Sequence, residues 1–574
     1  RMCTSHYGGD RMIKRVLLLA MVLLTAMTMG NLMASGDQEG DGATVSSGGT
    51  REAPPMGPNT NNGRPYNTVP MKHDSRADKY LYGINGTILP IVETPLTIDI
   101  WRSFNSTVMQ GLDENEAFKA MEEFTNIKIN WLYPPVGQAT DNFNLRVASN
   151  DLPHIFSNPP AYPGGYSKAI EDEVYLDLTP YYDAGMMPNI QWLRETREDI
   201  NKDIVDDMGR IFGFPVLDMI PTDPWSGLWV RGDWMQELGL DMPTTINDWD
   251  ILLRAMNEAY GATLGLNITS WYGVRVNYMF AGSFEAAYEF LQIDGQAKYG
   301  PIEDGYKDFL ALLNNWYEDG LIDPDFATRD QSSYNANMAN GTYGSFGMAY
   351  GDVGQAKITG TSIAPDFKMV PVLQPTSYKG QEIHLHQDNA TVRTNRDVVS
   401  VRALDENLVE PIVRWRDFHF SQDGGDLAAY GPEGISYKWL DNGEYEWIHP
   451  SLDNDDGLDF WTVYPLFKVH AWGSLRNSAS YENEQEVWDC IELWDTQDSS
   501  WLIPDNISHT AEESRELANI MTDINTYRDE MTLKFIVGQE PIDNFDDFVN
   551  TIKKLNIDRA IQIKTAALAR YNNR

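Results

Sequence analysis

One histidine pair and two acidic loops are the candidates for binding a metal ion. His384 and His386 form an HxH pair, which on a strand would place both imidazoles on one face, but no third ligand follows nearby. The acidic loops at 441–443 and 453–459 do not fit the register of an EF-hand, because unsuitable residues stand at the first ligand position. We therefore expect no metal and no other cofactor, and these loops leave calcium open as an alternative.

Aromatic side chains are a second set of candidate binding residues. The chain contains 17 Trp, 28 Tyr and 21 Phe, and exposed Trp and Tyr rings are suited to holding the faces of sugars. Most of these rings should fill the core. One aromatic segment precedes a hairpin signal at Asp294-Gly295 and contains Trp271, Tyr272, Tyr278 and Phe280. The composition is thus compatible with a carbohydrate ligand.

Motifs that would identify an enzyme are absent from the sequence. There is no dinucleotide fingerprint, phosphate loop, HExxH pair or GxSxG elbow. Hydrolysis of a glycoside needs a pair of carboxylates, and the 84 acidic residues neither select such a pair nor exclude one. We predict that the chain is not an enzyme, and a secreted glycosidase or polysaccharide lyase is the alternative.

Charge and cysteine content exclude further classes of function. The formal net charge is −40, and no cluster of Lys and Arg could bind phosphates, so neither nucleic acid nor an anionic membrane is expected as a partner. The two cysteines, Cys3 and Cys490, provide no disulfide framework and no Cys-based metal site.

The N-terminal region is predicted to direct export. Residues 12–34 combine Lys14 and Arg15 with an apolar run and small residues around Ala34, which is typical of a cleavable signal peptide. The apolar run is about 14 residues, shorter than the roughly 20 that span a membrane. No lipobox cysteine follows it, so we expect a free periplasmic or extracellular protein. Residues 35–80 are rich in Gly, Pro, Ser and Asn and are predicted to be a disordered linker.

The helices and strands predicted from the sequence are of the α/β class, and they would position a binding site. Alternating apolar residues at 96–100 and 127–131 flank a helical segment, and a second such unit ends in a short strand at 154–156. Such units form parallel strand pairs with right-handed crossovers. Ligands of parallel sheets bind beyond the carboxyl ends of the strands, so the loops at 103–107 and 157–160 are candidates, with plain turn formation as the alternative role of their polar residues.

Residues 228–256 contain two helix signals around a turn. The first helix should end at Gly239. The second should begin at Thr245, whose hydroxyl can accept from the backbone N–H of Asp248, and its apolar face consists of Trp249, Leu253 and Met256. With at least two domains expected from 574 residues, further strands are predicted within 341–354 and at 398–401, and further helices at 306–317, 408–415 and 545–555.

Five separated stretches resemble sequence blocks of one family. They lie at 150–156, 228–256, 319–327, 430–437 and 535–545, and read NDLPHIF, LWVRGDW to LLRAM, DGLIDPDFA, YGPEGISY and FIVGQEPIDNF. The first block departs from the usual Gly-Asp-Leu-Pro-Asp-Ile at Asn150 and His154. The chain therefore resembles the extracellular solute-binding proteins of family 1, which deliver sugars to ABC transporters, and in particular a long branch with lipoprotein-like and alginate-oligosaccharide-binding members.

The resemblance implies a two-lobed periplasmic-binding-protein type II fold with hinge crossovers. Lobe one would comprise 95–221 and 395–450, and lobe two would comprise 222–394 and 451–574. By the family's pattern, ligand contacts would come from Asn105, Ser157 and Asn158 in lobe one and from Trp271, Tyr272, Tyr350 and Asp352 in lobe two. Trp225 and Arg231 would lie near the hinge, and a late loop would add Trp472 and Arg476.

The function implied by the resemblance is that of the extracytoplasmic substrate-binding component of an ABC importer. A monomer would capture a carbohydrate, expected to be an oligosaccharide, between its lobes and deliver it to the membrane permease. Few basic residues are available to bind an acidic sugar, which favours a neutral one. A receptor for peptides or other solutes on the same scaffold is a further alternative.

Overall fold

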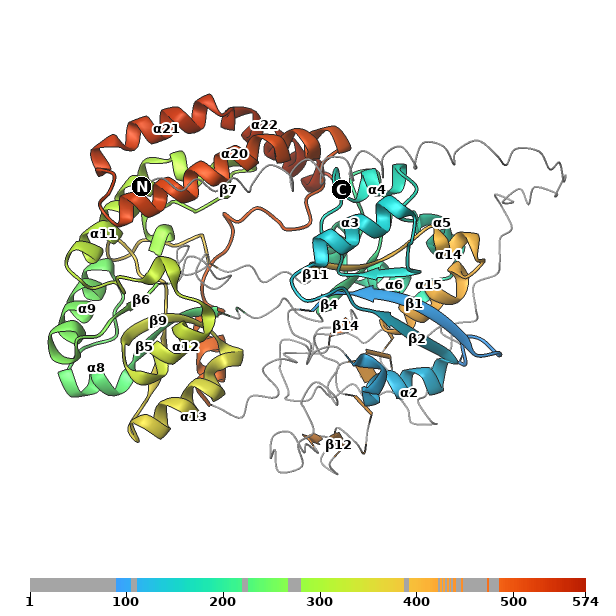
Figure 1. The fold of residues 1–574 in the computed structure, drawn as a ribbon, viewed down its shortest axis with the longest axis horizontal. Helices are drawn as coiled ribbons and strands as arrows, with labels where there is room; N and C mark the ends of the chain where they lie inside the picture. The colour runs from blue at the N-terminus through green and yellow to red at the C-terminus, as the bar shows by residue number, and fades with distance from the viewer. Residues whose placement is uncertain are drawn as a thin grey trace, which may run out of the picture. The chain divides into compact units, whose positions relative to one another are not determined.

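The computed structural model describes most of the chain after residue 88. The described residues are 89–104, 111–218, 224, 226–266, 280–386, 392–421, 424–425, 427–428, 431–432, 434, 437–439, 445–447, 472–473 and 485–574. All of them belong to one unit of residues 52–574, and the predicted signal peptide and linker lie outside them. They form two larger β-sheets with helices packed on both (Figure 1). None of the described helices is long and apolar enough to cross a membrane.

The first sheet contains the predicted β-α-β units. Its strand order is β14-β4-β11-β3-β1-β2, and β1 pairs in parallel with both β2 and β3, as predicted. β11 runs antiparallel between β3 and β4. It begins six residues before the strand predicted at 398–401, because its first half is mostly polar and gives no apolar pattern. The strands are β1 (Leu96–Arg102), β2 (Ile127–Leu132), β3 (Ile155–Ser157), β4 (Phe214–Asp218), β11 (Val392–Val399) and β14 (Trp472–Gly473).

The second sheet has four strands in the order β10-β5-β9-β6. Its central strands β5 and β9 are buried along their whole length, as strands covered on both faces are. The strands are β5 (Ser226–Arg231), β6 (Thr263–Gly265), β9 (Tyr343–Ala349) and β10 (Met369–Val372). Two hairpins complete the strands, β7 (Phe290–Ile293) with β8 (Gln296–Tyr299), and β12 (Tyr437–Trp439) with β13 (Tyr445–Trp447). The first turns at Asp294 and Gly295, both with positive φ, as predicted.

The helix caps follow the local sequence. α8 (Gly232–Leu238) ends at the left-handed Gly239, and α9 (Ile246–Tyr260) begins at Thr245, whose Oγ1 accepts from the Asp248 N–H at 3.2 Å. Both features confirm predictions. The other α-helices are α2 (Glu116–Thr125), α3 (Ala139–Ser149), α4 (Gly165–Glu171), α5 (Thr179–Asp183), α6 (Pro188–Thr196), α7 (Glu198–Ile204), α11 (Asp304–Glu318), α12 (Gln331–Asn340), α13 (Val353–Ile363), α14 (Arg402–Asp405), α15 (Val409–Phe418), α19 (Gln485–Trp494), α20 (Ala511–Ile536), α21 (Phe545–Lys554) and α22 (Ile557–Asn572).

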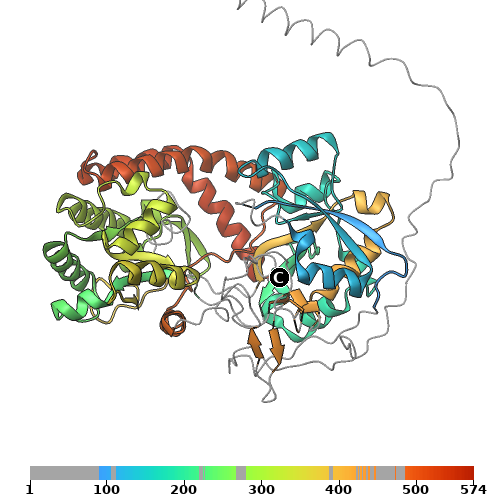
Figure 2. The same cartoon turned by 60° about the horizontal axis from the view of Figure 1, so that its bottom comes forward.

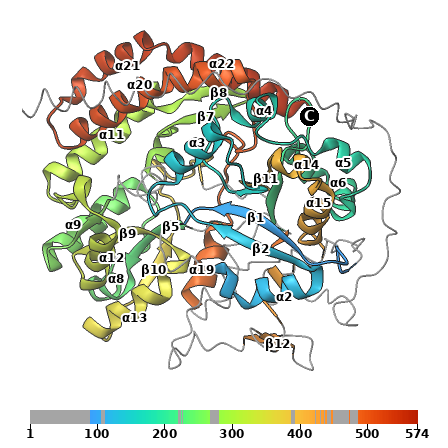
Figure 3. The ribbon, with the colours of Figure 1, turned by 45° about the vertical axis from the view of Figure 1, so that its right-hand side comes forward.

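Each sheet carries its own large apolar core. The first core joins strands β1, β3 and β4 to helices α6, α7 and α15. The second core joins β5 to α9, α11 and the C-terminal helices, and it contains Trp249, Leu253 and Met256, as predicted. The C-terminal helices α20, α21 and α22, drawn in red, pack against one another, and α20 also lies along α11 (Figures 1 and 3).

Between β4 and α19, the described elements imply three chain crossings between the two sheets. The chain passes from the end of β4 to the start of β5, returns from β10 to β11, and crosses again from β14 to α19, which packs on β10. β14 pairs in parallel with β4, so residues 472–473 join the first sheet, although residues 451–574 were assigned to lobe two. A two-residue strand has no periodic pattern that could have revealed this pairing.

Candidate functional site

One edge of the first sheet gathers the ends of its parallel strands. Because β1, β2 and β3 run in the same direction, their last residues Arg102, Leu132 and Ser157 lie along the same edge. We call this the first edge. β4 points the same way but starts at the level of this edge, because Phe214 and Ser157 both pair with Asp397. The end of β4 and the beginning of β11 therefore project roughly 13 Å beyond the first edge, and two of the crossings leave and enter the first sheet there.

A buried polar network lies along the first edge. Arg102 donates from Nη1 to Oγ of Ser157 at 2.7 Å. Asp397 of β11 stands opposite Ser157 in the strand register and forms an ion pair with Arg416 of α15 at 3.1 Å. All four side chains are buried. Burial lowers the pKa of the Arg102 guanidinium to about 10, and the Asp397 carboxylate opposes this shift. The network fixes the side chains at the ends of β1 and β3.

Aromatic rings continue the first edge beyond β1 and β2. The Arg102 guanidinium lies 5.1 Å from the centroid of Phe104, and Tyr133 follows the end of β2. Tyr133 is half-buried, its hydroxyl accepts from the Leu112 N–H at 3.1 Å, and burial raises its pKa. The rings of Tyr133 and Trp131 are nearly parallel, with centroids 6.4 Å apart. The sequence analysis did not select Arg102, the last residue of β1, or Tyr133, the first residue after β2, because both lie two residues beyond the predicted strands.

The second sheet presents a matching edge. Ser226 at the start of β5 pairs with Ala349 at the end of β9, and Gly265 at the end of β6 pairs with Phe346 of β9. Tyr350 and Ser226 therefore lie at one edge, with the end of β6 beside them. We call this the second edge. The chain enters β5 here from the first crossing, so both edges are joined by the crossings.

Trp225, predicted near the hinge, and Trp271 and Tyr272, predicted for lobe two, lie outside the described residues. Tyr350 is buried in an apolar cluster with Val487 and Trp494 of α19. Its ring is therefore packed as a core side chain.

The two remaining predictions, Asp352 for lobe two and Arg231 near the hinge, differ in position. Asp352 is half-buried at the N-cap of α13, close after the end of β9. Arg231 is at the opposite end of β5, five residues and about 17 Å of extended strand from Ser226. It is buried, pairs with Asp233 at 2.5 Å, and stacks on Trp234 at 3.9 Å. The prediction that Arg231 lies near the hinge does not hold for the crossing into β5, because the direction of β5 carries it to the far end of that strand.

The lobe-one predictions gather at the first edge where they are described. Ser157 ends β3 inside the polar network, and Asn158 follows it, exposed and with a φ of 48°, its N–H donating to the Arg396 carbonyl at 2.8 Å. Trp472, predicted for a late loop, is in β14 opposite Leu217 of β4, which places its backbone roughly 10 Å beyond the first edge on the same side of the sheet. Asn105 and Arg476 lie outside the described residues.

The histidine pair does not form the predicted strand face. Residues 381–386 contain no strand. His384 stacks on Trp501 and places Nδ1 2.5 Å from Oδ2 of Asp498, whereas His386 is buried, and burial lowers its pKa to about 4. Across the described parts of the chain, no group of three His, Cys, Asp or Glu could hold a metal ion. The acidic loops at 441–443 and 453–459 are outside those parts.

Comparisons with known proteins agree on one family. The profile described as bacterial extracellular solute-binding protein matches residues 105–392. Lipoprotein LipO of Bacillus subtilis is 27% identical over 255 residues, which are 40% of this chain and 46% of LipO, so that alignment spans less than half of the relative. The fructooligosaccharide ABC transporter substrate-binding protein FusA of Streptococcus pneumoniae is 21% identical over 525 residues, 85% of this chain and 93% of FusA.

A solved structure extends the likeness to the fold. The crystal structure of the alginate-binding protein AlgQ2 without calcium ion superposes with a TM-score of 0.68, at 19% sequence identity, over 83% of this chain and 99% of AlgQ2.

Proposed function

The chain belongs to the bacterial extracellular solute-binding proteins, and we propose that it is the substrate-binding component of an ABC importer that captures an oligosaccharide and delivers it to a membrane permease. Its fold is the two-lobed periplasmic-binding-protein type II fold. Family membership places it outside the cytoplasm. A free, monomeric protein released by a cleavable signal peptide is the finer part of this proposal.

The observation that carries the proposal is the meeting of the crossings with both sheet edges. The first crossing leaves β4 on the side of the first edge, roughly 13 Å beyond it, and enters β5 at the second. A ligand that contacts both edges would thus touch the segments whose backbone angles change when two lobes rotate. Binding at that place can be coupled to closure, because the ligand gains contacts only when both edges face it.

The chemistry of the first edge suits hydroxyl-rich ligands. Ser157 is buried and accepts from Arg102, which orders the end of β3, and the exposed Asn158 that follows it can offer its amide to ligand hydroxyls. Tyr133 adds an aromatic ring at the same edge, and Trp271 and Tyr272 are proposed to stack on sugar rings from the second. This combination of polar groups with aromatic faces supports a carbohydrate ligand.

A neutral and an anionic oligosaccharide would need different binding groups. The name of FusA specifies a fructooligosaccharide, which is neutral, whereas that of AlgQ2 specifies alginate, which is anionic. We favour a neutral oligosaccharide because Arg102 and Arg416, the arginines of the first-edge network, lie around the carboxylate of Asp397 and are engaged within the network.

Thermal shift followed by titration calorimetry tests the proposal. The purified protein is screened with fructooligosaccharides, alginate oligosaccharides and short peptides, and a tight ligand raises the melting temperature by mass action. Chromatography of the recovered sugar checks for cleavage. Stabilisation by an intact oligosaccharide supports the proposal. Cleavage would instead establish a glycosidase or lyase, and stabilisation by peptides alone would establish a peptide receptor.

A further inference from the structure

The C-terminal helices connect the two cores by a route separate from the three crossings. α20 has 26 residues, about 39 Å at 1.5 Å per residue. Its first turn lies against α4 of the first-sheet side, and its last turn, with Phe535 and Ile536, is part of the second core. In Figure 2 the red helices extend from the green and yellow elements to the cyan ones. α20 is therefore a rigid element in contact with both sides.

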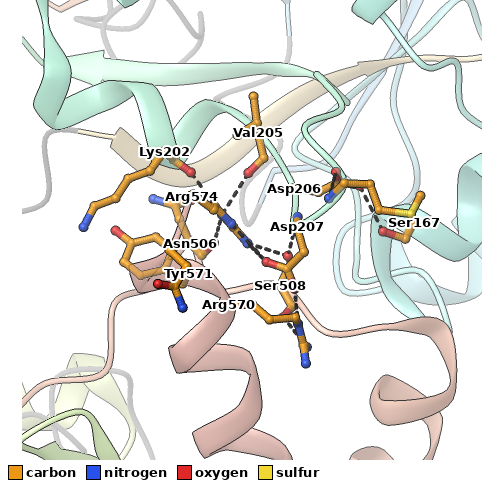
Figure 4. Close-up of polar contacts among 12 residues, drawn as sticks. Ser167, Lys202, Val205, Asp206, Asp207, Asn506, Ser508, Arg570, Tyr571 and Arg574 are labelled. Carbon is orange, nitrogen blue, oxygen red and sulfur yellow. Dashed lines mark hydrogen bonds and ion pairs between the residues drawn. The ribbon is translucent and has the colours of Figure 1, made fainter.

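The end of α22, with Arg570, and Arg574 just beyond it make an ion cluster with the segment after α7. Asp207 accepts from Arg570 Nε at 2.6 Å through one carboxylate oxygen and from Arg574 Nη2 at 2.6 Å through the other (Figure 4). Arg574 also donates to the carbonyls of Lys202 at 3.0 Å and Val205 at 2.8 Å. Its side chain is only 5% exposed. α22 begins in the second core with Ile557, so this cluster fastens the second core to α7 of the first.

The same cluster holds the loop between α19 and α20. Arg574 donates to the carbonyl of Asn506 at 3.1 Å, and the Asp207 N–H donates to Oγ of Ser508 at 3.2 Å. Asn506 in turn donates from Nδ2 to the carbonyl of Val392 at 2.7 Å. Val392 is the first residue of β11, where the second crossing enters the first sheet. Hydrogen bonds through Asn506 thus connect the ion cluster to the second crossing.

Arg570 links the cluster to the start of α20. It forms a bidentate pair with Glu513, with contacts of 3.0 and 2.5 Å, while its Nε contacts Asp207. Glu513 is also the N3 residue of the capping box of α20. The start of α20 is consequently held to Asp207 through Arg570, which also attaches the end of α22 to that carboxylate. Two guanidinium groups that share the Asp207 carboxylate have little freedom of orientation, because each plane must align with its own carboxylate oxygen.

We propose that the Asp207 cluster, made by Asp207, Arg570 and Arg574, is the fixed pivot of lobe closure. The cluster keeps one point of contact while the crossings flex, so the unliganded protein samples few relative orientations of its lobes. Ligand then binds with a smaller entropic cost than it would to an unpinned pair of lobes. This inference rests on the proposed function only for its effect on ligand affinity.

The test compares two isosteric substitutions that each remove one negative charge. Asp207→Asn breaks the cluster, whereas Glu516→Gln breaks the bidentate pair of Glu516 with Arg559, at 2.9 and 2.7 Å, which joins α20 to α22 without contacting the first core. Small-angle X-ray scattering of the unliganded proteins measures the spread of lobe orientations. We expect Asp207→Asn to increase the radius of gyration and Glu516→Gln to leave it at the wild-type value.

Affinity provides the second measurement. Asp207→Asn should raise the Kd for the best oligosaccharide by about tenfold without contacting the ligand, and Glu516→Gln should not. If Asp207→Asn does not fold, Arg570→Gln, at a more exposed position, is measured in the same way. Scattering curves and Kd values that coincide for the cluster variants, the control and the wild type would overturn the pivot. Failure of every sugar to bind would reject the proposed function, while the scattering comparison would still decide the pivot.

Discussion

The imidazole of His154 accepts a hydrogen bond at Nδ1 from the backbone N–H of Asp99, at 2.8 Å. Its Nε2 lies 2.9 Å from Oε2 of Glu406. Since Nδ1 is an acceptor, Nε2 must carry the proton and donate to the carboxylate, which fixes the neutral tautomer. In the family's sequence block that residues 150–156 resemble, aspartate is usual at the position of His154. Here the imidazole joins β1, β3 and the end of α14.

Replacing His154 by Phe should destabilise the fold by about 2 kcal/mol, because the Asp99 N–H loses its acceptor in a largely buried place. His154→Gln keeps an acceptor and a donor and should cost less. Urea denaturation measures both free energies of unfolding. Equal stabilities of the Phe and Gln variants would show that the hydrogen bonds contribute nothing beyond packing.

Gly227 should not tolerate even a methyl group. A Cβ at this position of β5 would lie 2.2 Å from the ring of Trp494, whose Nε1 donates to the Val372 carbonyl at 3.0 Å. We expect Gly227→Ala to cost about 3 kcal/mol through overpacking. Gly320→Ala is the control, since Gly320 has a φ of 71° but nothing within 4 Å of its Cβ, and it should cost about 1 kcal/mol from backbone strain alone. Similar losses in thermal or chemical unfolding would contradict the packing argument.

The stability of the protein should depend on pH through Asp417. Burial raises the pKa of this carboxyl from 3.8 to about 7, although the backbone N–H groups of Asn189 and Ile190 donate to it and partly oppose the shift. A raised folded-state pKa means that the contribution to stability is complete below pH 3.8 and is lost as the pH rises through about 7.

Asp417→Asn cannot ionise, so its free energy of unfolding should fall less than that of the wild type between about pH 4 and pH 8, a range that covers the titration of Asp417. Urea denaturation at several pH values measures the two slopes. All other titrating groups are shared by the two proteins. Parallel curves would mean that Asp417 keeps one ionisation state across this range.

Trp271 is the predicted sugar platform that is simplest to test. Trp271→Ala should raise the Kd for the oligosaccharide by about tenfold, because a stacking face is removed. Trp234→Ala is a matched control: its ring is sandwiched between Tyr260 and Arg231, at centroid distances of 4.3 and 3.9 Å, on the far edge of the second sheet. The control should lower the melting temperature but keep the affinity. Unchanged affinity of Trp271→Ala would remove this residue from the site.

The local elements and the family could be predicted from the amino-acid sequence. The Thr245 cap, the left-handed Gly239 and the Asp294-Gly295 turn depend on residues within a few positions of one another, and apolar periodicity reports which face of a helix is buried. These features were predicted correctly because their causes are short-range. The five sequence blocks carried the family, which the profile match then showed.

Contacts between residues far apart in the sequence became visible in the tertiary structure alone. Arg102 and Ser157 are 55 residues apart, and Arg574 and Asp207 are 367 apart, so no periodicity in either segment could pair them. The direction of β5 placed Arg231 away from the edge that holds Tyr350, and the two residues of β14 joined the first sheet through backbone hydrogen bonds that any sequence can form. Strand order and direction fix such contacts, and they are properties of the whole chain path.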